Sequence, residues 1–153
     1  MFRLSKNNNL EMGKTMSMGY GAAYTDVIEY DALESICKDA LNEFIDTLGA
    51  GDYVDENGDS DMQAFARDIE YNDVDEESKE YVAYKKLADA FKKETGLELG
   101  IGFHDQDETG DRYDDIDGAF FWIDGMYDLT PAGKALKDKC GDAVSRKFFV
   151  QYG

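Results

Sequence analysis

The strongest hydrophobic pattern in this 153-residue sequence runs from position 31 to 49, where apolar residues recur at steps of three and four. This spacing places them along one face of an α-helix. The apolar positions are Leu33, Ile36, Cys37, Ala40, Leu41, Phe44, Ile45 and Leu48. The pattern predicts an amphipathic helix in which Asp31, with Glu34 behind it, caps the start and Gly49 marks the end. Because Cys37 lies on the apolar stripe, we expect a core thiol there.

A polar loop over 49–61 and two further helices are expected next. A short helix has its apolar side at Met62, Phe65, Ala66 and Ile69. A longer helix over 73–96 has its apolar side at Tyr84, Leu87, Ala88 and Phe91. Acidic residues fill the first turns of this helix and lysines fill the last, which suits the helix macrodipole.

After position 96 the hydrophobic period changes to two, which is typical of β-strands. Leu97, Leu99, Ile101 and Phe103 alternate along one predicted strand. Two apolar runs flank Asp124-Gly125, which predicts a hairpin with a type I′ turn. Thr130 and Pro131 fit the N-cap and first position of a helix that ends near Cys140. Residues 144–152 read as a final strand.

These elements predict an α+β fold, with N-terminal helices packed on a small antiparallel sheet and a C-terminal helix and strand. Residues 1–25 show no sustained period, so we expect an irregular or partly mobile arm before a single domain over 26–153. A 42% hydrophobic content is enough for one core. Neither a membrane-spanning run nor a leader-type segment is present, which predicts a cytoplasmic protein with no membrane partner. Cys37 and Cys140 are expected to be reduced thiols.

The formal net charge is −18, and the acidity belongs to the middle of the chain. Residues 26–128 contain 31 acidic and 8 basic residues. The two densest stretches are 52–77, with eleven acidic residues, and 104–128, with nine. Such a surface repels the phosphate backbone, so we expect no direct binding to nucleic acid.

Two acidic stretches match part of a calcium-binding EF-hand loop. Positions 1, 3, 5, 6 and 7 of such a loop are matched by Asp105, Asp107, Thr109, Gly110 and Asp111. Positions 1, 3, 5 and 7 are matched again by Asp55, Asn57, Asp59 and Asp61. Position 12, which supplies a bidentate Glu, is Ile116 in one and Ala66 in the other. We therefore predict no dedicated metal site, and a calcium-binding module using 55–61 and 105–117 is the alternative hypothesis.

Catalytic signatures are short and incomplete. A predicted strand followed by Asp105-x-Asp107-x-Thr109 resembles the first motif of haloacid-dehalogenase-type phosphatases, in which the first Asp is the nucleophile and the second the acid/base beside magnesium. Only 44 residues follow Thr109, too few for the βα units of that fold. His104 is the only histidine, and no Ser lies in a Gly-x-Ser-x-Gly elbow. We expect no enzymatic activity and no cofactor.

The remaining hypothesis is that the negative surface itself binds. In an extended segment, carboxylates two residues apart lie ~6.6 Å from each other on one face, and such rows could imitate nucleic-acid phosphates. The partner would be a protein with a basic DNA- or RNA-binding surface, such as a nuclease or DNA-binding complex; the oligomeric state stays open. The candidate contact residues are Asp105, Asp107, Glu108, Asp111, Asp114, Asp115 and Asp117, with Tyr113 as an anchor, backed by Asp55, Glu56, Asp59 and Asp61. In composition the chain resembles the small acidic nucleic-acid mimics with which phages and mobile elements block restriction or CRISPR nucleases.

Overall fold

The computed structural model describes residues 20–104, 116–126 and 130–152, and the side chains of 24–148 within these ranges. The elements are β1 (Tyr20–Ile28), α2 (Tyr30–Ala50), α3 (Met62–Glu70), α4 (Lys79–Thr95), β2 (Glu98–His104), β3 (Gly118–Asp124), α6 (Pro131–Cys140), the 3₁₀ turn η1 (Gly141–Ala143) and β4 (Val144–Tyr152). The predicted α+β fold, with helices packed on a small antiparallel sheet, is confirmed.

The sheet has four strands in the order β2-β3-β1-β4, and each neighbouring pair is antiparallel. Helices α2 to α4 connect β1 to β2, and α6 connects β3 to β4. This is a β-α-β-β-α-β connectivity of the ferredoxin-like kind, with two extra helices in its first connection. A fold at this level says nothing about function.

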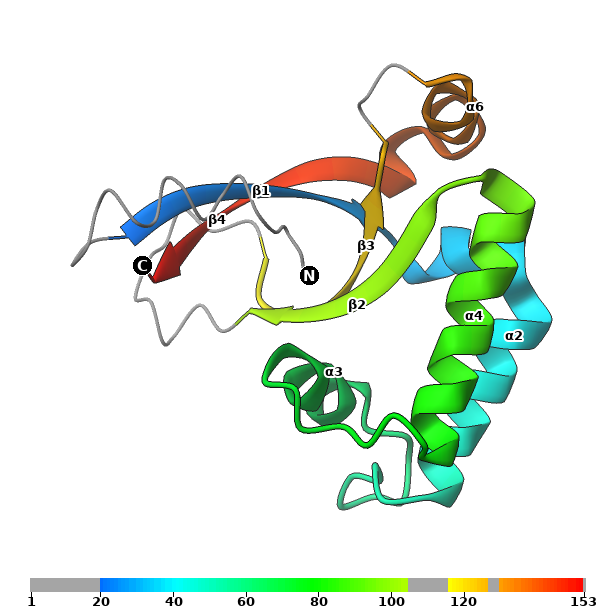
Figure 1. The fold of residues 1–153 in the computed structure, drawn as a ribbon, viewed down its shortest axis with the longest axis vertical. Coiled ribbons are helices and arrows are strands. Elements are labelled where there is room, and N and C mark those ends of the chain that lie inside the picture. Colours follow the sequence, from blue (N-terminus) through cyan, green and yellow to red (C-terminus); the bar gives the residue numbers. More distant parts are fainter. Residues whose placement is uncertain (1–19, 105–115, 127–129, 153) are drawn as a thin grey trace.

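The helices cover one face of the sheet. Alternate strand residues point into the core from that face, including Ile28, Leu99, Ile101, Phe121, Ile123 and Val144. They meet an aromatic cluster in which the Phe44, Phe65 and Tyr84 rings pack edge to face or tilted. Figure 1 shows α2 and α4 side by side, α3 close to β2, and the β1–β4 ribbon extending away from the helices. No helix among the described residues is both long and apolar enough to cross a bilayer.

Strand β1 differs from the expected irregular arm. It pairs with β4 along its whole length, from Tyr20 opposite Tyr152 to Ile28 opposite Val144, and with β3 only near its end. Residues 20–25 therefore belong to the sheet, while residues 1–19 lie outside the described residues. The sequence does not indicate this part of the strand, because residues 20–25 read YGAAYT and show no alternation of apolar and polar positions.

The hairpin predicted at Asp124-Gly125 is wrong. Both edges of β3 are already occupied, one by β2 and the other by β1, so no edge is left for a returning strand. Gly125 does adopt the left-handed conformation that the motif suggested, with φ 86°. The turn leads instead to the buried Met126 and on towards α6.

Some of the predicted helix ends match the observed ones and others do not. Thr130 caps α6 as predicted, because its side chain accepts a hydrogen bond from Gly133 N, and Pro131 is the first helical residue. At α2, however, Asp31 is not the cap: the N-cap is Glu29, which makes no side-chain capping bond, and the helix continues past Gly49 to Ala50. Helix α4 begins at Lys79, later than predicted, because the Ser78 hydroxyl accepts from Tyr81 N at 3.2 Å.

Both cysteines are free thiols, and the expected core position of Cys37 is confirmed. The backbone of Cys37 leaves helical geometry at φ −131° and ψ 47°, which kinks α2 at this point. Burial, followed by the nearby Glu94 carboxylate, raises the pKa of the Cys37 thiol. Both effects disfavour a reactive thiolate.

Candidate protein-binding surface

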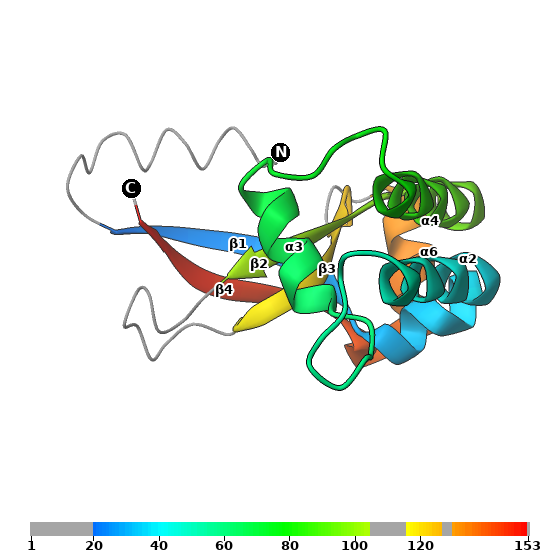
Figure 2. The same cartoon turned by 90° about the horizontal axis from the view of Figure 1, so that it is seen from below.

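The most acidic part of the described chain is the stretch from Asp52 to Glu80, called here the acidic segment. It contains twelve acidic residues against Arg67 and Lys79. It comprises most of loop 51–61, helix α3, loop 71–78 and the first two residues of α4. Figures 1 and 2 show the two loops on either side of α3 at the same end of the molecule.

Loop 51–61 is organised by the carboxylate of Asp55. Its Oδ1 accepts hydrogen bonds from Asn57 N at 2.8 Å and from Asp59 N at 3.0 Å. Val54 and Ser60 pair across the loop as an isolated β-bridge. An Asp side chain that binds the backbone two residues on is a common way to stabilise a turn. Asp55 therefore shapes the loop rather than presenting a free charge.

Two further carboxylates of the acidic segment have structural roles around α3. Asp61 caps the helix by accepting from Ala64 N at 3.0 Å. Asp68 Oδ2 accepts from the Tyr53 hydroxyl at 2.7 Å, and the Tyr53 ring packs edge-on against Phe65. Burial, followed by the Asp68 hydrogen bond, raises the pKa of Tyr53 above its ordinary value.

The C-terminal end of α3 starts the second acidic loop. Asn72 has φ 57°, and the N–H groups of Asn72 and Asp73 donate to the carbonyls of Ile69 and Asp68. This is a Schellman-type helix end, with Asn at the position that glycine usually fills. In the loop itself, Asp75 Oδ1 accepts from Glu77 N at 2.9 Å.

Helix α3 also binds the two strand ends that flank residues 105–117. Gln63 Oε1 accepts from Ala119 N at 2.9 Å, at the start of β3. Glu70 Oε1 accepts from Phe103 N at 3.4 Å, at the end of β2, and the Arg67 guanidinium lies 4.9 Å above the Phe103 ring. The chain between these strands thus leaves and re-enters the sheet beside α3.

The predicted contact residues fall into three groups. Seven lie outside the described residues: Asp105, Asp107, Glu108, Asp111, Tyr113, Asp114 and Asp115. Asp55 and Asp61 are half-buried, and their carboxylates bind backbone N–H groups. Glu56 and Asp59 are exposed, and within the described chain their carboxylates have no hydrogen-bond or salt-bridge partner; Asp117 is also exposed.

Three further exposed acids were not among the contact residues predicted from the sequence. Asp73, Glu76 and Glu77 in loop 71–78 are exposed, and their carboxylates have no partner in the described part of the protein. Tyr71 lies beside them with 56% of its surface exposed, and Val54 in the other loop is 37% exposed. The sequence did indicate this loop, because its acids belong to the dense acidic stretch 52–77.

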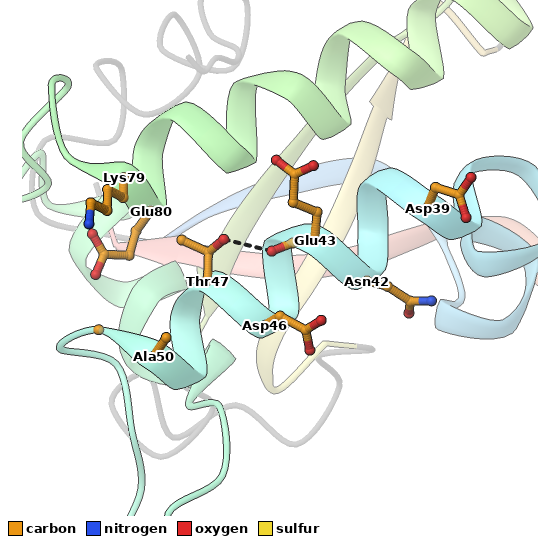
Figure 3. A pocket seen from close by; sticks show the side chains of 9 residues that line it. Asp39, Asn42, Glu43, Asp46, Thr47, Ala50, Lys79 and Glu80 are labelled. Carbon is orange, nitrogen blue, oxygen red and sulfur yellow. Dashed lines mark hydrogen bonds between the residues drawn. The ribbon is translucent and has the colours of Figure 1, made fainter.

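A groove lies next to the acidic segment, between the outer face of α2 and the start of α4 (Figure 3). Its volume is about 540 Å³. It is lined by Asp39, Asn42, Glu43, Asp46, Thr47, Ala50, Gly51, Lys79 and Glu80. Glu43 pairs with Lys86 at 3.2 Å, and Glu80 accepts from Asp52 N at 3.3 Å. The groove extends the negative surface from the acidic segment onto α2.

No metal site is visible in the described ranges, where no group of three or more His, Cys, Asp or Glu side chains is arranged to hold an ion. Part of the alternative calcium loop, residues 105–115, lies outside those ranges. Comparisons of the chain with protein families, with curated proteins and with solved structures found no match.

Proposed function

We propose that this protein is a non-enzymatic binding protein that imitates nucleic-acid phosphates and occupies a basic DNA- or RNA-binding surface of a partner protein. One observation supports the proposal: α3 belongs to one acidic stretch and, through Glu70 and Gln63, binds the strand ends at Phe103 and Ala119, on either side of the acids of 105–117. The acidic segment together with these two strand ends is called here the acidic end.

The proposed contact groups are first the exposed carboxylates of the acidic segment that have no partner within the described chain: Glu56, Asp59, Asp73, Glu76 and Glu77. The acids of 105–117 are proposed with them from the sequence, and all of these except Asp117 lie outside the described residues. A partner groove lined with Lys and Arg attracts anions from solution, and an acidic protein that binds there displaces them. The association is therefore electrostatic and weakens as salt is added. Tyr71 supplies exposed aromatic area among the acids, which suits an interface anchor.

The proposed target class is a nuclease or DNA-binding complex, including those of restriction and CRISPR systems, because their basic grooves complement such a surface. The proposed role of the acidic end is to bind a partner, without catalysing a reaction. The calcium alternative finds no support in loop 51–61, since the Asp55 carboxylate is taken up by the loop's own backbone.

The test compares three variants that each remove five carboxylates, which makes the net charge less negative, from −18 to −13. The first changes the free acids of the acidic segment to amides: Glu56, Asp59, Asp73, Glu76 and Glu77. The second changes Asp105, Asp107, Asp111, Asp114 and Asp115. The matched control changes exposed acids of α2, α4, α6 and η1: Asp31, Asp89, Glu94, Asp138 and Asp142.

Wild type and variants are used as bait in nuclease-treated bacterial lysate, and each captured protein is purified and tested for displacement by duplex DNA. We expect wild type and control to retain a partner that DNA displaces, while either acidic-end variant loses at least about tenfold in affinity. Equal loss in the control variant, or a partner indifferent to DNA, would contradict phosphate mimicry. Saturable calcium binding at micromolar metal would favour the alternative.

A further inference from the structure

Loop 51–61 contains Asn57-Gly58, the only Asn-Gly pair in the sequence. Asn57 is exposed, and its carboxamide has no hydrogen-bond partner within the described chain. Gly58 is exposed, has φ 85°, and has no neighbouring atom within 4 Å of the place where a Cβ would stand. The Asn57 carboxamide is therefore open to water, and no neighbouring side chain crowds the Gly58 Cα.

We propose that Asn57-Gly58 is a site of spontaneous deamidation, by which the acidic loop gains a carboxylate. The Gly58 nitrogen loses its proton to a base in solution and attacks Asn57 Cγ. This attack closes a five-membered ring. The Cγ–Nδ2 bond then breaks, and the leaving nitrogen takes up a proton and departs as ammonia, which leaves a succinimide. Water then opens the ring at either carbonyl and yields aspartate or isoaspartate at position 57. One water is consumed and one ammonia is released, with no change of oxidation state.

The loop's own hydrogen bonds set the rate of this reaction. Gly58 N–H donates to the Asp55 carbonyl at 3.1 Å, and Asn57 N–H donates to Asp55 Oδ1 at 2.8 Å. The first bond must open before the nitrogen can attack, because a nitrogen held in a turn lacks the freedom to reach Cγ. Loosening the loop with Asp55→Ala is therefore expected to speed the reaction severalfold.

Deamidation would place a new charge between Glu56 and Asp59, in the loop assigned to partner binding. An effect on partner affinity rests on the proposed function. The covalent change does not, since it depends only on the loop. A mass and charge measurement consequently tests the modification whether or not the acidic end binds a partner.

The experiment incubates the full chain at mildly alkaline pH and body temperature and follows it by anion-exchange chromatography, intact mass and peptide mapping. We expect a later-eluting species with one added negative charge, mapped to position 57, whose rate rises with pH. Asn57→Gln should not form it on this timescale, and Asn57→Asp supplies the elution standard for the aspartate product.

Three outcomes would overturn the proposal. The folded protein could form no new acidic species. The change could map to another asparagine, such as Asn42 or Asn72, neither of which precedes glycine. Deamidation at 57 could also occur only in urea, which would show that the folded loop protects the pair. Each is read from covalent mass and is distinguishable from a failure of partner binding.

Discussion

Asp55 and Glu56 are sequence neighbours with the same charge but different roles. The Asp55 carboxylate accepts two backbone N–H groups, whereas the exposed Glu56 carboxylate has no partner within the described chain. Asp55→Ala should lower the free energy of unfolding by about 1–2 kcal/mol, because two loop donors lose their acceptor. Glu56→Ala removes the same charge and should stay within about 0.5 kcal/mol of wild type. Urea unfolding measures both, and equal losses would contradict a structural role specific to the Asp55 carboxylate.

The Tyr53 hydroxyl makes a pH-dependent contribution to stability. Burial and Asp68 raise its pKa in the folded protein above the ordinary 10.0, so the proton leaves the unfolded chain first as pH rises. The stabilisation is therefore complete below pH 10 and is lost progressively at higher pH. Tyr53→Phe should cost about 1–2 kcal/mol at neutral pH through the lost hydrogen bond to a carboxylate.

The cost of Tyr53→Phe should shrink when unfolding is repeated in urea above pH 10. Tyr71→Phe, which removes an exposed hydroxyl, is the matched control for loss of a phenol. A difference between wild type and Tyr53→Phe that stays constant from neutral to alkaline pH would contradict the assigned role of Asp68.

The roles of single acids could not be predicted from the sequence, although their density could. In the sequence, nothing about residue type distinguishes Asp55, Asp61 and Asp68 from Glu56 and Asp59. What separates them is whether a backbone N–H or a hydroxyl lies within reach, and that depends on how loop 51–61 closes against α3. Residue type alone therefore locates the acidic surface without telling structural carboxylates from free ones.

At the scale of elements, α2 begins without a side-chain cap. Glu29 occupies the N-cap with extended geometry, φ −74° and ψ 153°, and its side chain makes no capping bond. Glu29→Ser keeps the backbone N–H, which donates to the Ala143 carbonyl, and adds a short hydroxyl acceptor. It should raise the free energy of unfolding by about 1 kcal/mol. The reverse experiment, Ser78→Ala at the capped start of α4, should lower it by a similar amount, and no change in either would show that capping is unimportant here.

The helices were more predictable than the strands for a physical reason. A period of 3.6 over four or five turns requires many apolar positions to agree, as in α2 and α4. Among the described side chains of β1, from Tyr24 to Ile28, the deeply buried ones are Ile28 and Asp26, and Asp26, 8% exposed, is held by Arg146 at 3.1 Å. The Asp124-Gly125 motif identified a left-handed glycine, but which strands pair with β3 depends on contacts far along the chain.

For the whole molecule, the sequence shows that the acidity lies in the middle of the chain, but not which elements the two dense stretches contact. Residues 52–77 and 104–128 are separated in the chain by α4 and most of β2. Contact between α3 and the strand ends at Phe103 and Ala119 depends on Glu70 and Gln63 binding their backbone N–H groups. Long-range contacts of this kind carry no local sequence signal.

Salt should affect folding and binding in opposite directions. The Debye length falls from about 30 Å at 0.01 M to about 10 Å at 0.1 M salt, so moderate salt screens repulsion among the charges that sum to −18. If screening contributes about 1 kcal/mol, the melting temperature should rise by about 2–4 °C. The same salt should weaken the proposed complex by more than about tenfold, because attraction to a basic groove is screened as well.

The three five-carboxylate variants separate these two effects. Each carries −13, so at low salt each should melt above wild type and respond less to added salt, wherever its substitutions lie. Partner binding should instead depend on position, failing in the two acidic-end variants and surviving in the control. Calorimetric melting and partner titration on the same samples give both quantities. If binding followed net charge as melting does, the acidic end would be a source of general repulsion and not a binding surface.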